Sequence, residues 1–114
     1  MIYEDYIRTL IKKQEAIKLL REAEGLEESS GRDVRGAAIR TAQMAIDRRE
    51  RQLQAMREEM RNSEDVDDRI YYHVFIKKRS PGTVGKLVGY SRSSVFRHAR
   101  RIRETKKQIK EGLE

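Results

Sequence analysis

The sequence predicts an all-α protein in which an N-terminal helical hairpin or coiled coil precedes a C-terminal helix-turn-helix domain. Only one Pro and seven Gly interrupt the 114 residues, so helices can be long. Charged residues (39%) outnumber apolar ones (37%), which suits amphipathic helices that each bury one stripe. We therefore expect a helical oligomerisation segment over residues 1–62 and a second domain over residues 63–114.

The first expected helix covers residues 2–24. Gly25 is a plausible end for it, because glycine tolerates the left-handed conformation common after a helix. Residues 25–36 then form a polar connector long enough to reverse the chain. The apolar positions recur at steps of three and four residues, namely Tyr3, Tyr6, Ile7, Leu10, Ile11, Ile17 and Leu20.

The second expected helix covers residues 37–61 and has a heptad-like apolar pattern, interrupted by Arg49. Such a stripe predicts packing against another helix. The partner is either the first helix, in an antiparallel hairpin, or a second chain in a homodimer formed through these N-terminal helices. The stripe consists of Ile39, Ala42, Ile46, Leu53, Met56 and Met60.

A third helix is expected over residues 65–79, capped by Ser63 or Asn62. The acidic residues Asp65, Asp67 and Asp68 fit the positive end of its dipole and are not interpreted as a metal site. Its inward face would carry Val66, Ile70 and Val74, with Tyr71 and Phe75 as further candidates. Ser80 then caps a fourth helix whose first residue is Pro81, where a missing N–H costs nothing.

Residues 81–100 have the pattern of a helix-turn-helix. Gly85 is small enough for a second helix to cross closely, and Gly89 tolerates the positive φ that the turn requires. Ser91 is a suitable N-cap for the second helix. Apolar residues fill the inward positions, namely Val84, Val88, Tyr90, Val95, Ala99 and Ile102, with Leu87 as a further candidate.

The excess positive charge lies in the same region. Residues 1–64 carry 13 Lys/Arg and 13 Asp/Glu, whereas residues 65–114 carry 13 Lys/Arg and 6 Asp/Glu. All of the net charge of +7 therefore lies in the second part of the chain, which favours a polyanionic partner.

We expect residues 91–110 to be a recognition helix that enters the major groove of double-stranded DNA. Arginine can bind guanine O6 and N7 bidentately, whereas Lys86 and Ser94 are better suited to phosphates. Phe96 could contact a thymine methyl group or pack. The predicted DNA-binding residues are Lys86, Ser91, Arg92, Ser93, Ser94, Phe96, Arg97, Arg100 and Arg101. Residues 102–110 are either a phosphate clamp or a solvated extension, and include Arg103, Lys106, Lys107 and Lys110.

The segment TVGKLVGYSRSSVFRHARRI, residues 83–102, resembles region 4 of bacterial sigma factors. It also resembles small phage late-transcription regulators of the ArpU and RinA type. The matching positions are Val84, Gly85, Leu87, Gly89, Ser91, Val95 and Arg97. Gly85 stands where Ala is commoner, and His98 where an apolar residue is frequent.

The resemblance implies a phage or mobile-element transcription regulator that binds double-stranded DNA and could contact RNA polymerase. Two alternatives remain open. A terminase small subunit also pairs a helix-turn-helix with a helical oligomerisation segment. A coiled-coil protein that binds RNA polymerase would use the basic helix only in support.

Other classes find no support in the sequence. There is no Cys, and the two histidines, His73 and His98, are too isolated to suggest a zinc site. We expect no metal, no cofactor and no catalysis, because no phosphate loop or nucleophile motif is present. The N-terminus does not resemble a secretory signal, and no apolar run is long enough for a membrane span. We therefore expect a location in the bacterial host cytoplasm.

Overall fold

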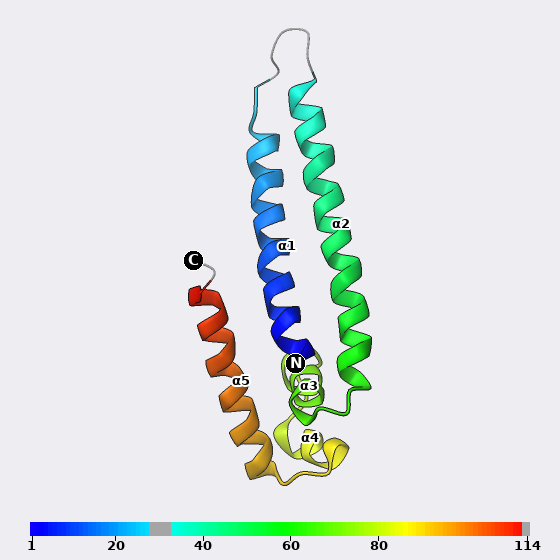
Figure 1. Cartoon of the computed structure of the whole chain (residues 1–114), viewed down its shortest axis with the longest axis vertical. Helices are drawn as coiled ribbons and strands as arrows, with labels where there is room; N and C mark the ends of the chain where they lie inside the picture. Colours follow the sequence, from blue (N-terminus) through cyan, green and yellow to red (C-terminus); the bar gives the residue numbers. More distant parts are fainter. Residues whose placement is uncertain (28–32, 113–114) are drawn as a thin grey trace. The chain divides into compact units, whose positions relative to one another are not determined.

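The computed structural model describes residues 1–27 and 33–112, and these residues form an all-α fold (Figure 1). This confirms the predicted fold class. The elements are α1 (Ile2–Glu24), α2 (Val34–Arg61), α3 (Val66–Ile70), the π-helical segment η1 (Tyr71–Ile76), α4 (Pro81–Val88) and α5 (Arg92–Gly112).

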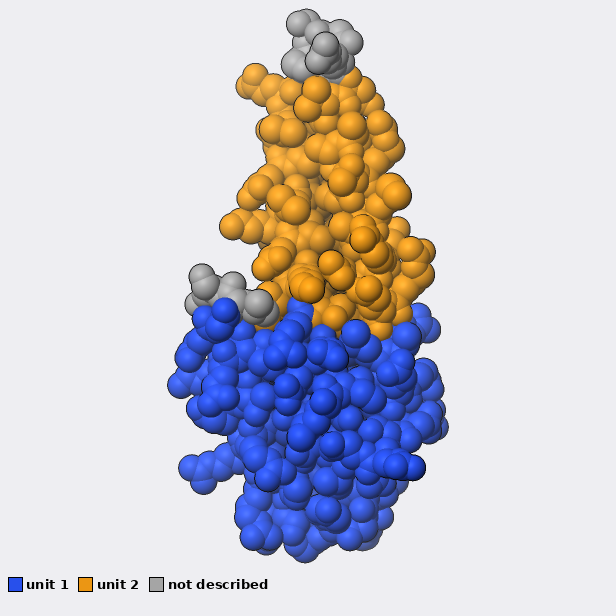
Figure 2. Space-filling view, in the orientation of Figure 1, with its two compact units in different colours: residues 1–8, 54–114 blue, residues 9–53 orange. Residues whose placement is uncertain are grey.

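The chain divides into two compact units (Figure 2). Residues Thr9–Leu53 form a hairpin unit, and Met1–Arg8 together with Gln54–Glu114 form a C-terminal unit. These units differ from the predicted segments 1–62 and 63–114, because the start of α1 and the end of α2 belong to the C-terminal unit. For example, the backbone N–H of Tyr3 donates to Asp68 Oδ1 over 2.9 Å.

Within the hairpin unit, α1 and α2 pair in antiparallel fashion inside one chain. Lys13 of α1 forms an ion pair with Glu50 of α2, and Ala23 late in α1 shares a groove with Ala42 early in α2. The heptad pattern therefore serves pairing within the chain, which the sequence had left open. The buried positions of α1 here are the small residues Thr9, Ala16 and Ala23. The larger Ile17 and Leu20, expected to be buried, are half-buried beside them.

The structure corrects the boundaries around the connector. α1 ends at Glu24 as expected, but Gly25 is not left-handed, and its N–H donates to Arg21 O over 3.2 Å. α2 begins at Val34, earlier than residue 37, because Asp33 Oδ1 accepts the N–H of Gly36 over 2.9 Å. Residues 28–32 of the predicted connector lie outside the described residues.

The segment after α2 departs most from expectation. The helix expected over residues 65–79 is instead the short α3 followed by the wider turns of η1. Its cap is Asp65, whose side chain accepts the N–H of Asp67 over 2.8 Å, rather than Ser63 or Asn62. A prediction based on 3.6 residues per turn cannot register a π-helical segment, which has a different period. Of the expected inward residues, Ile70 and Tyr71 are buried, whereas Val66, Val74 and Phe75 are half-buried.

The core of the C-terminal unit draws on every part of that unit. Its least exposed apolar side chains are Ile7, Met60, Ile70, Val84, Val95 and Ile102. Tyr71 stacks on Tyr3 and Phe75, with ring centroids 5.7 and 5.2 Å away, and meets the Tyr6 ring edge-on at 5.6 Å. Burial raises the pKa of Tyr71, with a smaller contribution from Tyr6. These aromatic rings connect the start of α1 to η1, on which α4 and α5 pack.

Candidate nucleic-acid interface

The start of α4 is specified locally, as predicted. Ser80 lies in an extended conformation before the helix, and its Oγ accepts the N–H of Thr83 over 3.4 Å. Pro81 is the first helical residue. Together they fix where α4 begins, and hence where its buried residues Val84 and Val88 point.

The two glycines perform the roles expected of them. Gly89 ends α4 with a φ of 76°, the left-handed conformation. A Cβ on Gly85 would lie 2.5 Å from the carbonyl oxygen of Tyr90, so only glycine fits there without a shift. The N–H of Tyr90 also donates to Gly85 O over 2.8 Å. The turn is thus held tightly against α4.

Two expected apolar contacts are not made. Tyr90 is 40% exposed rather than tucked under the turn, and its ring lies 5.3 Å from that of His98. Leu87 is 52% exposed and does not join the inward face of α4. Val84, Gly85 and Val88 alone supply the buried surface of this short helix.

α5 has a buried face and an exposed face. Ser91 Oγ accepts the N–H of Ser94 over 3.1 Å, which confirms Ser91 as the residue that caps this helix. Val95, Ala99 and Ile102 are buried as predicted. Every residue predicted to contact DNA is at least partly accessible: Ser94 is half-buried, and Lys86, Ser91, Arg92, Ser93, Phe96, Arg97, Arg100 and Arg101 are exposed.

Local contacts order part of the exposed face. The Arg92 guanidinium lies 5.5 Å from the centre of the Phe96 ring, so Phe96 remains at the surface beneath a cation. Arg97 donates to Ser94 Oγ over 3.1 Å, and Ser94 also accepts from Ser91 over 3.0 Å. These contacts hold the side chains while leaving much of the guanidinium groups accessible.

Arg101 differs from the other predicted DNA-binding residues. Its side chain is 61% exposed, but its Nη2 donates to both carboxylate oxygens of Asp67, over 3.0 and 3.2 Å. Asp67 is 4% exposed, and its Oδ1 also lies 2.6 Å from His98 Nδ1. His98, which stands where an apolar residue is frequent in the families that this segment resembles, is therefore half-buried against a carboxylate.

The sequence alone does not predict that Asp67 contacts α5. The sequence indicated only an acidic residue at a helix start, a position that it does occupy in α3. Its partners lie 31 and 34 residues further along the chain. No local pattern links such positions, so only the folded structure shows that Asp67 anchors α5 to α3.

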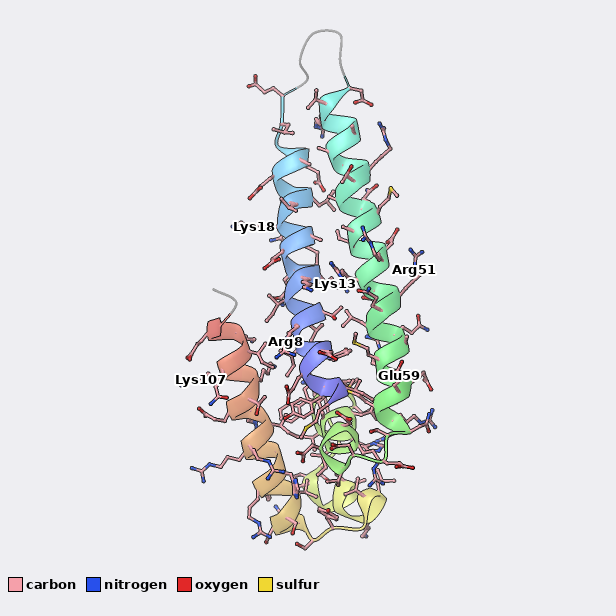
Figure 3. The ribbon with its side chains drawn as sticks, viewed as in Figure 1. Arg8, Lys13, Lys18, Arg51, Glu59 and Lys107 are labelled. Carbon is pink, nitrogen blue, oxygen red and sulfur yellow. The ribbon has the colours of Figure 1, made fainter. Side chains whose placement is uncertain are left out.

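The later part of α5 carries a second group of cations. The Arg103 guanidinium lies 5.4 Å from the centre of the Phe75 ring, and Lys107 is exposed (Figure 3). Burial lowers the pKa of Lys106, and the charges of Lys110 and Lys78 lower it further. Positive charge is therefore concentrated along this part of the helix.

Within residues 1–27 and 33–112, no group of three or more His, Asp or Glu residues is arranged to hold a metal ion. None of the helices in the same ranges is both long and apolar enough to cross a membrane. Comparison of the chain with protein-family models, curated proteins and solved structures finds no match.

Proposed function

We propose that this protein binds double-stranded DNA in a sequence-specific manner and regulates transcription, with α4 and α5 as a helix-turn-helix. One observation carries the proposal. The N-terminal part of α5 buries Val95 and Ala99 and exposes Arg92, Arg97 and Arg100. A helix that is fixed on one face and arginine-rich on the other suits the major groove.

The chemistry of the exposed face supports reading of base edges. Arginine is the side chain that most often recognises guanine, through paired hydrogen bonds to O6 and N7. Phe96 offers an apolar surface for a thymine methyl group. Lys86 and the cations after Ile102 suit phosphates, which position a protein on DNA without reading its sequence.

The regulatory role rests on the resemblance to sigma region 4 and to ArpU- and RinA-type regulators. In this proposal the protein is encoded by a phage or mobile element and acts in the bacterial cytoplasm. Its positive charge supports approach to DNA, since the net charge of +7 favours electrostatic steering.

A homodimer is part of the proposal, because a single small module would bind DNA weakly. Leu19 and Met44 of the hairpin unit are 57% and 69% exposed and offer apolar surface for a second copy. Two recognition helices would then read half-sites about 34 Å apart. Sedimentation of the full chain should give twice the monomer mass, and Leu19→Lys with Met44→Lys should reduce it to that of a monomer.

The recognition helix can be tested by selecting a binding site from random duplexes and then substituting Arg92→Ala with Arg97→Ala. We expect affinity for the selected site to fall by about 2–6 kcal/mol, at roughly 1–3 kcal/mol for each lost arginine–guanine pair. Lys18→Ala with Arg21→Ala is the control, because both side chains are exposed on α1 and the net charge changes equally. Equal losses in the two double variants, or no recovered consensus, would overturn the assignment.

A further inference from the structure

The C-terminal unit contains an open basic pocket that lies outside α5. Its volume is about 630 Å³, within the range of about 300–1,000 Å³ typical of ligand pockets. Three cations line it: Arg61 at the end of α2, and Lys77 and Arg79 in the segment between η1 and α4. No carboxylate is among the described residues that line the pocket.

His73 forms part of this pocket and is in direct contact with Arg79. The backbone N–H of Arg79 donates to His73 O over 3.0 Å, and Arg79 Nη1 makes a hydrogen-bond contact with His73 Nδ1. Because a guanidinium can only donate, this contact requires the neutral ring with Nδ1 as acceptor. Burial lowers the pKa of His73, and the charges of Arg79, Arg61 and Arg69 lower it further.

The backbone brings the cations of the pocket together. Lys78, between Lys77 and Arg79, has a φ of 57°, an uncommon conformation for a residue with a Cβ. Lys77 lies over the buried Tyr72 ring, 5.6 Å from its centre. This segment is therefore a defined turn that directs both flanking cations into one pocket.

A further residue of the pocket lining, Thr83, also suits the binding of an oxyanion. Thr83, in the first turn of α4, lines the pocket close to the positive end of the helix dipole, and its hydroxyl shares a hydrogen bond of 2.9 Å with Ser80 Oγ. Guanidinium groups match the oxygens of phosphate in pairs, and lysine adds a point charge. Two arginines, a lysine, a histidine and a threonine together suit a tetrahedral, multiply charged anion better than a single carboxylate.

We infer that this pocket binds a phosphate group, supplied either by the DNA backbone or by a free phosphate-bearing molecule. The inference goes beyond the proposed function, because binding of free phosphate does not depend on α5 as a recognition helix. The inference also predicts that anion binding is coupled to protonation of His73. A bound anion would offset the guanidinium charges beside His73, so the pKa of His73 should rise when the pocket is filled.

The two histidines of the chain make the test direct. We would follow both imidazole rings of the full-length protein by NMR while adding inorganic phosphate, with acetate at equal ionic strength as the comparison. Phosphate should shift the His73 resonances saturably and raise the pKa of His73, whereas His98, paired with Asp67, should not respond. Arg79→Ala and Arg61→Ala should each abolish the response, and the exposed Arg51→Ala in the hairpin unit should retain it.

A second arm identifies the source of the phosphate. Binding of a random-sequence duplex is measured over a range of salt concentrations for the wild type, Arg79→Ala and Arg51→Ala. If the pocket holds a backbone phosphate, DNA shifts His73 and Arg79→Ala reduces the slope of log K against log salt by about 0.9. Arg51→Ala should leave that slope unchanged.

The outcomes are separable. A His73 response to phosphate that requires Arg79 supports a site for a free phosphate-bearing molecule, even if the protein binds no DNA. A response to DNA alone, together with the reduced slope, supports a contact with the DNA backbone. If neither phosphate nor DNA changes His73 in an Arg79-dependent way, or if acetate acts as phosphate does, the inference is wrong.

Discussion

The hairpin unit and the C-terminal unit are both helical, but different interactions hold them together. In the hairpin unit, small side chains such as Ala16, Ala23 and Ala42 are buried, and a partly exposed ion pair, Lys13–Glu50, links the helices. The C-terminal unit instead contains two buried aspartates, Asp67 and Asp68. We therefore expect stability in the hairpin to be distributed over many contacts, and stability in the other unit to depend more on a few buried polar residues.

The largest effect that would test this comparison is expected for Asp67→Ala. The substitution removes the carboxylate that His98 and Arg101 share, and leaves Arg101 Nη2 with its contact to His98 Nδ1 at 2.9 Å. Breaking a buried ion pair costs about 3–5 kcal/mol, and we expect about 2–3 kcal/mol here because both partners are partly exposed. Urea unfolding would measure the loss. The exposed Asp47→Ala in α2 is the control and should change stability by less than about 0.5 kcal/mol. Similar values for the two variants would contradict the comparison.

Gly85→Ala should have the next largest effect. It should lower the free energy of unfolding by about 1–3 kcal/mol, as is typical when an extra group is forced into a tight contact. The added Cβ would meet the backbone oxygen of Tyr90, which cannot rotate away. Gly82→Ala provides a control in the same helix, because nothing lies within 4 Å of its Cβ position and alanine favours the helix. Thermal unfolding of both variants should give opposite signs, and equal shifts would show that the approach of Tyr90 to α4 is not tight.

Gly89→Ala should lower the free energy of unfolding by a smaller amount, about 1–2 kcal/mol, because the left-handed conformation disfavours a Cβ. The site is otherwise open, with nothing near the Cβ position. Gly89→Asn should therefore recover part of the loss, since asparagine tolerates this conformation better than alanine. Chemical denaturation can rank the three proteins. An alanine variant as stable as the wild type would show that the turn does not require glycine at this position.

The smallest effect is expected in the hairpin unit, for Lys13→Ala. Partly exposed ion pairs contribute about 0–1 kcal/mol, and salt screens them. The loss should shrink when unfolding is repeated at high salt, while the loss caused by Asp67→Ala should persist. A loss at Lys13 as large as that at Asp67 would mean that the hairpin also depends on single residues.

The sequence predicted best what short-range signals determine. Ser80, Pro81, Gly89 and Ser91 act on backbone groups within a few residues of themselves, so their roles at the ends of α4 and α5 could be expected. The buried face of α5, with Val95, Ala99 and Ile102, follows from the same helical period.

What the sequence could not predict depends on contacts between distant positions. Asp68 accepts the N–H of Tyr3 from 65 residues away, and Asp67 reaches α5. These contacts explain why the two aspartates are buried and why Arg101 is not free. The π-helical turns of η1 have no signature in a pattern of apolar residues. The basic pocket was missed for the same reason, since its cations come from separate segments.

The hydrogen bond from the Tyr3 N–H to Asp68 limits how the protein can be divided into fragments. The C-terminal unit is discontinuous in sequence, because it includes Met1–Arg8 as well as Gln54–Glu114. A fragment beginning at residue 63 would lack Ile7 and Met60, two of its least exposed side chains. In terms of modular architecture, the hairpin is an insertion within the other unit. We therefore expect the protein to tolerate the removal of one heptad from each helix of the hairpin. We expect it to tolerate division of the chain at a single point between the two units less well.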